Sequence, residues 1–299
     1  MEFGLVIPHT GPFASPQFVR SYCVTAEEAG FDGLWAVDHM VMPHHTDSKY
    51  TLGRQPASIA DDAVSKQLSP NYEMHTTLAW VAGFTRRVKL GTCVAVLPIR
   101  NAVANARQVA TLDIYSGGRV LYGVGAGWLR EEAEAMNMPW DRRGHRAEEH
   151  IELMRTLWCA NGDLVEFHGE FHDCPPMDPE PRPVQRPIPI VVGGHSDVAL
   201  DRAGRIGDGW ISAQMSPARL AEHWTKVKDA ASRNDRDPDT LLLVSSIPLV
   251  EGEDERVDAL HTRAEGEVDH CIIGLRATTP DAALDEIRQI GEEVLPRFR

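Results

Sequence analysis

The pair Asp38–His39 places a carboxylate beside an imidazole, a combination suited to moving a proton near neutral pH. An apolar run over residues 31–37 precedes the pair, so we expect it to stand at the end of a β-strand. Neighbouring residues of a strand point to opposite faces. One of the two side chains can therefore reach a site while the other bonds an adjacent segment. A histidine with a structural role only is the alternative.

Glycines stand at the ends of two further predicted strands. In GGRVLYGVGAGW, residues 117–128, their spacing does not match the dinucleotide-binding pattern G-x-G-x-x-G. Gly125 and Gly127, followed by Trp128, instead predict a glycine-lined rim. Such a rim leaves room either for a flat ligand or for close packing of the strands.

The sequence Gly193-Gly194-His195-Ser196 predicts a second part of the site. Two glycines and a residue that can cap a helix present backbone N–H groups at the start of a helix expected from residue 197. Such N–H groups form a site for an anion, and we expect a phosphate there. The alternative is an ordinary turn in which Ser196 only caps the helix.

Two groups of residues raise the question of a metal ion. They are Asp38 with His39, His44 and His45, and His168 with His172. Neither group has a recognised ligand spacing, so the sequence predicts no metal site. A metal-dependent barrel hydrolase built on these histidines is a rival hypothesis, and metal analysis of the purified protein would test it.

Short apolar runs alternate with helical patterns along the chain, which indicates a parallel sheet with helices between its strands. We predict strands at residues 3–8, 31–37, 88–97, 120–125, 187–192, 209–212, 241–249 and 271–275. Eight such units in 299 residues favour one (β/α)₈ TIM barrel over residues 1–299, with a doubly wound sheet as the alternative. Active sites of TIM barrels lie where the strands end, which is where the candidate residues stand.

Two long stretches interrupt the alternation. Residues 40–71 follow the second strand, and we expect a lid or a wall of the substrate site there, with disorder as the alternative. Residues 161–186 follow the fourth βα unit and contain LVEFHGEFHDC, which predicts a small hairpin.

The composition excludes several classes of partner. A net charge of −14 argues against broad binding to nucleic acid or anionic membranes. The five cysteines are scattered and form no C-x-x-C pair, which favours a reducing compartment and predicts a cytoplasmic protein. No signal peptide and no stretch of membrane-spanning length is evident.

Several of these segments, in the same order, resemble the bacterial-luciferase-like family of flavin and deazaflavin oxidoreductases. The most specific is VKLGTCVAVLPIRNAVANARQVATLDIYSGGRVLYGVGAGW, which resembles the family's LPxR, ATLDxLSGGR and GVGxGW in succession. Further matches are AEEAGFDGLWAVDH, PIPIVVGG, RAGRIGDGW and HCIIGLR. The similarity covers nearly the whole chain and is greatest to the branch that uses coenzyme F420.

The resemblance implies a TIM-like barrel that holds a deazaflavin ring at its mouth. In deazaflavin members a non-prolyl cis peptide bond in the third strand backs the ring, and the matching residues are Cys93 and Val94. By the same resemblance, His39 would accept or donate the proton that accompanies hydride transfer, and Asp38 would orient the ring or its pocket.

The resemblance also assigns cofactor contacts. Gly193, Gly194 and His195 would hold the phosphate-bearing tail through their backbone, and the rim at Gly125 and Gly127 would lie beside the ring. Trp128 stands where the sugar-phosphate-oxidising branch has a glutamate; it cannot act as an acid or base and is expected to shape the pocket. Arg276 is a candidate for the basic contact to the tail that the sequence lacks after the sixth strand.

The expected partners are a small-molecule substrate and a second copy of the chain in a homodimer. One alternative keeps the fold but uses FMN, reduced by a separate reductase, in a two-component monooxygenase. Another is a catalytically degenerate flavin-binding protein.

Overall fold

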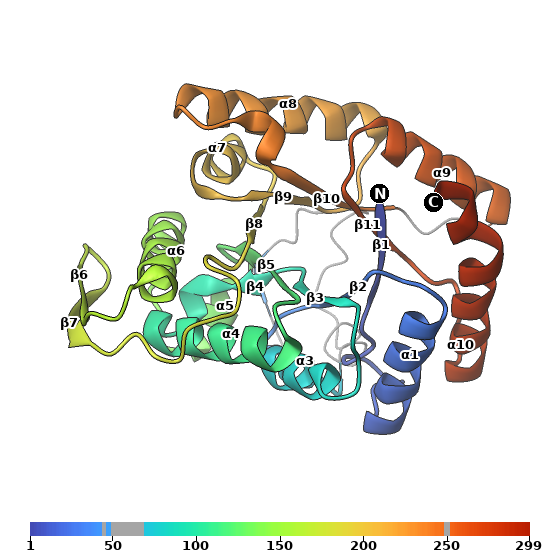
Figure 1. The fold of residues 1–299 in the computed structure, drawn as a ribbon, viewed down its shortest axis with the longest axis horizontal. Coiled ribbons are helices and arrows are strands. Elements are labelled where there is room, and N and C mark those ends of the chain that lie inside the picture. The colour runs from blue at the N-terminus through green and yellow to red at the C-terminus, as the bar shows by residue number, and fades with distance from the viewer. Residues whose placement is uncertain (44–45, 49–68, 248–251) are drawn as a thin grey trace.

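The computed structural model describes residues 1–43, 46–48, 69–247 and 252–299. In this part of the chain, parallel strands surround a central axis and helices pack around them (Figure 1). The sheet closes because β3 pairs with β5, with Leu90 opposite Val120. The protein is therefore the predicted (β/α)₈ barrel, and closure excludes the doubly wound alternative, whose sheet is open.

The barrel strands follow one another around the axis in chain order. They are β1 (Glu2–Val6), β2 (Gly33–Ala36), β3 (Lys89–Thr92), β4 (Ala95–Val96), β5 (Val120–Gly125), β8 (Ile190–Gly193), β9 (Gly209–Ser212), β10 (Leu242–Ser246) and β11 (His270–Ile273). Strands β3 and β4 share one position in the barrel.

The third predicted strand is interrupted. Residues 88–97 were expected to form one strand, but the peptide bond between Cys93 and Val94 is cis and separates β3 from β4. Both parts still pair with β5, and Ala95 lies opposite Val124. The cis peptide bond implied by the family resemblance is thus confirmed at the expected residues.

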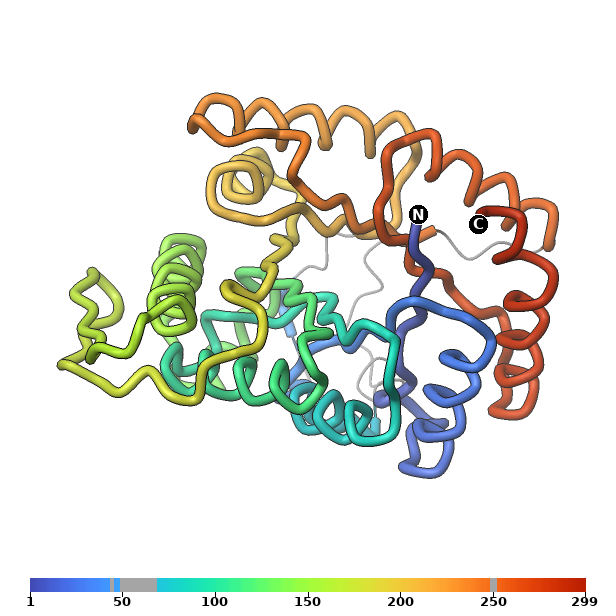
Figure 2. Tube along the Cα trace, in the orientation of Figure 1, coloured from blue at the N-terminus to red at the C-terminus, as the bar shows by residue number. Residues whose placement is uncertain are grey.

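The helices form the outer layer. They are α1 (Pro16–Glu28), α3 (Met74–Ala82), α4 (Ala102–Ser116), α5 (Arg130–Ala135), α6 (Arg143–Cys159), α7 (Asp197–Ile206), α8 (Pro217–Arg233), α9 (Glu253–Glu265) and α10 (Pro280–Gln289). Short 3₁₀ turns occur at Leu97–Ile99, Pro238–Thr240 and Leu295–Phe298, and a π-helical turn at Ile290–Val294. Helices α1 and α10 pack together, so the first and last βα units meet (Figure 2).

The core has two layers. Inside the barrel, Trp35 packs with Leu121, Val191, Ile211, Val244 and Ile272. Its indole fits because Gly4 and Gly91 on the neighbouring strands carry no Cβ that would collide with it. The second layer lies between the strands and the helices, where outward strand residues such as Leu5 and Leu34 are fully buried. Burial on both faces explains the nearly continuous apolar strands.

The two insertions have different outcomes. Within residues 161–186, β6 (Val165–His168) pairs antiparallel with β7 (Asp173–Met177), which confirms the hairpin. It projects from the barrel beside α6 (Figure 2). Most of the 40–71 segment, including residues 44–45 and 49–68, lies outside the described residues, so the predicted lid stays a prediction. None of the described helices is long and apolar enough to cross a membrane.

Candidate active site

The carboxyl ends of the parallel strands meet at one end of the barrel, here called the mouth. His39 follows β2 at this end, with its side chain 18% exposed, and its Nδ1 lies 3.1 Å from Oε2 of Glu132 on α5. The Glu132 side chain is only 2% exposed. A carboxylate oxygen accepts a hydrogen bond, so Nδ1 of His39 is the donor in this contact, and Nε2 is the ring nitrogen left to face another group.

Glu132 also holds the chain that follows His39. Its Oε1 accepts hydrogen bonds from the backbone N–H groups of Met40, at 2.6 Å, and Val41, at 3.2 Å. The Asn71 side chain donates to the carbonyl oxygen of His39 at 2.7 Å. The start of the 40–71 segment is therefore bonded to Glu132, and its last residue is bonded to the backbone of His39.

Asp38 points away from His39, as expected for neighbours at a strand end. Its carboxylate, 1% exposed, accepts from the backbone N–H of Val96 at 2.8 Å and from Nε and Nη2 of Arg100 at 3.2 and 2.5 Å. Arg100 is itself 7% exposed. The prediction that one member of the pair bonds an adjacent segment is confirmed, and Asp38 holds β4 at the mouth.

A buried chain of hydrogen bonds continues behind this ion pair. Arg100 Nη1 lies 3.3 Å from Nδ1 of His75, and Nε2 of His75 lies 3.3 Å from the Tyr122 hydroxyl, which donates to Asn105 at 2.9 Å. Burial, and then the charge of Arg100, lower the pKa of His75 to about 4. A neutral His75 accepts from Arg100 at Nδ1 and donates at Nε2, so every bond in the chain has a consistent direction.

Trp128 and two glycines at strand ends, Gly125 and Gly193, lie at the mouth. The Trp128 indole meets the His39 ring edge to face, with centroids 6.0 Å apart. A Cβ at Gly125 would lie 2.8 Å from Cγ2 of Val94, and a Cβ at Gly193 would lie 3.0 Å from its Cγ1. These two glycines therefore make room for Val94, and close packing, the alternative left open by the sequence, accounts for them.

The predicted anion site lies at the end of β8. Ser196 caps α7 by accepting from the N–H of Ala199, and Gly194 has a φ of +124°. His195 Nε2 accepts from the N–H of Ala213 at 3.4 Å, whereas its buried Nδ1 has no hydrogen-bond partner in the described chain. Burial, and then the charges of His223 and Arg219, lower the pKa of His195 to about 4, so its ring is neutral at pH 7.

Arg276 already binds two carboxylates. Its Nε lies 3.3 Å from Oε1 of Glu286, and its Nη2 lies 3.4 Å from Oε2 of Glu253. The backbone N–H of Arg276 also donates to Glu286 at 2.9 Å. An anionic ligand at this guanidinium would compete with both acidic side chains.

The histidines do not form a metal centre in the part of the chain that the structure describes, where no group of three or more His, Cys, Asp or Glu side chains could hold an ion. His168 instead bonds Asp173 at 2.6 Å on the hairpin, and the His172 ring packs against His150. His44 and His45 lie outside the described residues.

Sequence reasoning missed two residues of this site. Arg100 is the last residue of the LPxR motif. It could have been predicted as a site residue because it is a cation directly after a strand that ends at the mouth. Glu132 stands four residues after Trp128 in a short acidic helix, and no local pattern distinguishes it from Glu131 or Glu134. Only its burial and its bond to His39 identify it.

Comparisons with known proteins agree with this architecture. The family model described as luciferase-like monooxygenase matches residues 1–290. An uncharacterized protein of Mycobacterium tuberculosis strain H37Rv is 37% identical over 203 residues, 68% of this chain and 67% of that protein. The phthiodiolone/phenolphthiodiolone dimycocerosates ketoreductase of the same strain is 32% identical over 233 residues, 73% of this chain and 57% of the ketoreductase.

A solved structure of an F420-dependent secondary alcohol dehydrogenase, in complex with an F420-acetone adduct, superposes on the chain with a TM-score of 0.79. The alignment covers 100% of this chain and 99% of the dehydrogenase, at 18% sequence identity. At this identity the likeness establishes the shared barrel fold.

Proposed function

Because the chain belongs to the luciferase-like monooxygenase family, we propose that it is a coenzyme F420-dependent oxidoreductase that interconverts a small carbonyl compound and its alcohol. The observation that carries the proposal is the His39–Glu132 pair at the mouth of the barrel. A ketoreductase among the relatives and an alcohol dehydrogenase among the similar structures support this pair of substrate classes.

The residues at the mouth fit a phosphate-bearing cofactor. His195 has a buried Nδ1 without a partner among the described residues, and it directly precedes the capped N-terminus of α7, where backbone N–H groups favour an anion. Val94, packed between Gly125 and Gly193, would form the wall behind the ring. When bound, the deazaflavin would supply the site that accepts or gives up a hydride.

His39 accepts or donates the proton that accompanies hydride transfer. Oxidation of an alcohol releases a hydroxyl proton, and Nε2 of His39 accepts it; reduction of a carbonyl needs a proton on oxygen, and the same atom donates it. Glu132 holds Nδ1 as the donor and stabilises the imidazolium that forms when Nε2 takes up the proton. Glu132 is thus a positioning residue, and His39 is the catalytic one.

Cofactor choice is tested by titrating the cofactor-free protein with oxidised coenzyme F420 and, separately, with FMN, while following tryptophan emission. Trp128 at the mouth and Trp210, which donates to the Gly194 carbonyl at 2.9 Å, are the expected reporters. Selective binding of F420 supports the proposal. Selective binding of FMN would replace it with a monooxygenase component served by a separate reductase, and binding of neither would favour a degenerate protein.

The role of Glu132 is tested by Glu132→Gln, with Glu131→Gln as a matched control. Glu131 bonds Ser48 and the backbone of Asp47 without touching His39. An amide facing Nδ1 reverses the hydrogen bond and puts the proton on Nε2, so we expect kcat to fall on the order of 100-fold or more and its pH profile to change. F420 affinity should stay constant in both variants. Normal turnover in Glu132→Gln, or in His39→Ala, would refute the assignment.

A further inference from the structure

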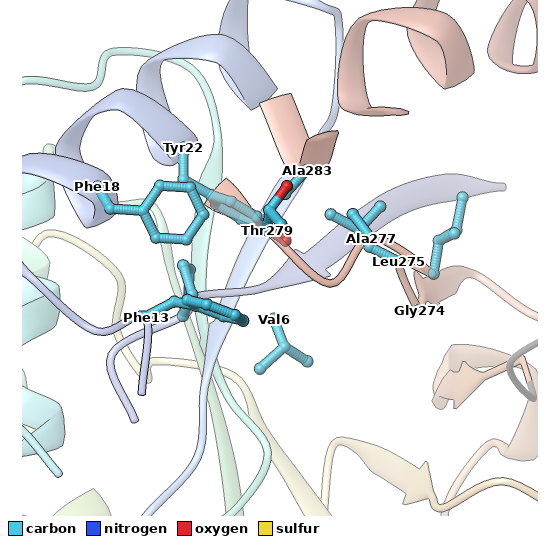
Figure 3. A pocket seen from close by; sticks show the side chains of 11 residues that line it. Val6, Phe13, Phe18, Tyr22, Gly274, Leu275, Ala277, Thr279 and Ala283 are labelled. Carbon is cyan, nitrogen blue, oxygen red and sulfur yellow. The ribbon is translucent and has the colours of Figure 1, made fainter. Parts of the chain in front are cut away.

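A second feature of the mouth is a cavity of about 220 Å³ between the first and last βα units, here called the side pocket. Its walls include Val6 at the end of β1, Phe13, Phe18 and Tyr22 from the following loop and α1, and Leu275 and Thr279 after β11. Figure 3 shows the aromatic rings on one side of the cavity and Leu275 and Ala277 on the other.

The side pocket and the two glycines beside Val94 lie on different walls of the barrel. The strand order runs β3, β2, β1, β11, β10, β9, β8, β5, so β1 and β11 face the strands that carry Gly125 and Gly193 across the mouth. His39 follows β2, between these walls. Asn71 donates to the carbonyl oxygen of His39 and forms a β-bridge with Thr10, so it connects His39 to the β1–α1 loop, which also carries the pocket residue Phe13.

The pocket is apolar apart from two hydroxyl groups. Thr279 uses its oxygen to cap α10, where it accepts from the N–H of Ala282. Tyr22 is 4% exposed, and its hydroxyl has no hydrogen-bond partner in the described part of the chain. Burial raises the pKa of Tyr22, so the group stays a neutral donor. The hydroxyl oxygen is not one of the enclosed side-chain atoms that lack a partner in the described chain, so it is open to the cavity, where it can donate to a ligand atom.

The volume sets the size of the group that fits. A cavity of roughly 150 Å³ lined by apolar side chains accommodates benzene, and complete ligand sites occupy about 300–1,000 Å³. A volume near 220 Å³ therefore holds one ring-sized part of a substrate and not a whole cofactor. The side chains of Phe13 and Val6 are 43% and 38% exposed. A ring that fills the pocket would remove their apolar surface from water, which favours binding.

We propose that the side pocket is the specificity subsite for an aryl group that carries a hydrogen-bond acceptor, on a carbonyl or alcohol substrate whose reacting carbon lies at His39. The Tyr22 hydroxyl donates to the acceptor, and the ring packs between Phe13, Phe18 and Leu275. The placement of the reacting carbon at His39 rests on the proposed function. Binding of the ring in the side pocket does not depend on the cofactor and can be tested separately.

The test compares three ketones as probes: acetone, acetophenone and 4-methoxyacetophenone. Ala277→Phe fills the pocket, Tyr22→Phe removes only the hydroxyl and keeps the edge contact with Phe18, and Ala218→Phe on the exposed side of α8 is the matched control. We expect Ala277→Phe to lower kcat/KM with F420 at least tenfold for both aryl ketones while leaving acetone unchanged. Tyr22→Phe should lower it about fivefold for the methoxy compound alone.

Binding of the same probes is measured separately by ligand-observed NMR without cofactor. The subsite is supported if the aryl ketones bind to wild type and to Ala218→Phe but not to Ala277→Phe. If they bind in this way and no ketone is turned over with F420, only the proposed function is refuted. Equal binding of the aryl ketones to wild type and Ala277→Phe, or equal kcat/KM values for acetone and the aryl ketones in wild type, would overturn the subsite while leaving the proposed function intact.

Discussion

Removing the charge of Asp38 tests whether this residue is catalytic or holds the mouth in place. In Asp38→Asn the amide oxygen can still accept from Val96, but Arg100, 7% exposed, loses its only carboxylate within 3 Å among the described residues. Breaking a buried ion pair by removing one partner costs about 3–5 kcal/mol. Glu73 remains 3.7 Å from Arg100 Nη1 and offsets part of this cost. We therefore expect a loss of about 3 kcal/mol in the free energy of unfolding.

A double-mutant cycle isolates the pair. Arg100→Met removes the cation, and in Asp38→Asn/Arg100→Met no unpaired charge is left buried. The double variant should therefore be destabilised by less than the sum of the single variants, with a coupling energy of about 2–3 kcal/mol. The free energy of unfolding is measured for all four proteins by urea denaturation at pH 7.5, followed by tryptophan emission.

Measurements of kcat and of stability, taken together, distinguish a positioning role of Asp38 from a catalytic one. If Asp38 is a positioning residue, the activity lost in Asp38→Asn should accompany a loss of stability and of F420 binding, and the double variant should lose less stability than the two single variants together. A variant destabilised by less than about 1 kcal/mol, folded and able to bind F420, yet reduced in kcat more than 100-fold, would refute this reasoning and make Asp38 a catalytic residue.

Two further predictions concern stability and packing. The pKa of His75 is lowered from its ordinary 6.5 to about 4 in the folded protein, so the unfolded chain binds more protons between these pH values. The contribution of neutral His75 is complete above pH 6.5 and decreases as the pH falls; urea unfolding should show that wild type loses about 2 kcal/mol more than His75→Gln between pH 7 and pH 5. Gly125→Ala brings a Cβ against Val94, so we expect the free energy of unfolding to fall by about 1–3 kcal/mol and F420 binding in the emission titration to weaken. Gly266→Ala, whose Cβ has no contact closer than 3.4 Å, is the control and should change neither quantity. Equal effects of the two substitutions would contradict the packing account.

The barrel fold, and the end of the barrel that carries the site, follow from the pattern of the amino-acid sequence. Apolar runs that alternate with helical patterns leave few arrangements open, because each strand buries both faces and each helix buries one. Parallel strands bring their carboxyl ends to one edge, so the sequence pattern alone assigns His39, Trp128 and His195 to the mouth. The alternation of side chains along a strand also predicted that Asp38 and His39 would point apart.

The groups that these residues contact depend on the packing of distant elements and could not be predicted from the sequence. Glu132 is 93 positions from His39, and Arg100 is 62 positions from Asp38. Such contacts depend on how α5 and the turn after β4 are rotated against β2, which no local periodicity encodes. The same holds for Tyr22. Its position on the apolar face of α1 predicts core, but the β11–α10 loop leaves a cavity beside it, because burial against one element does not determine how closely the next one packs.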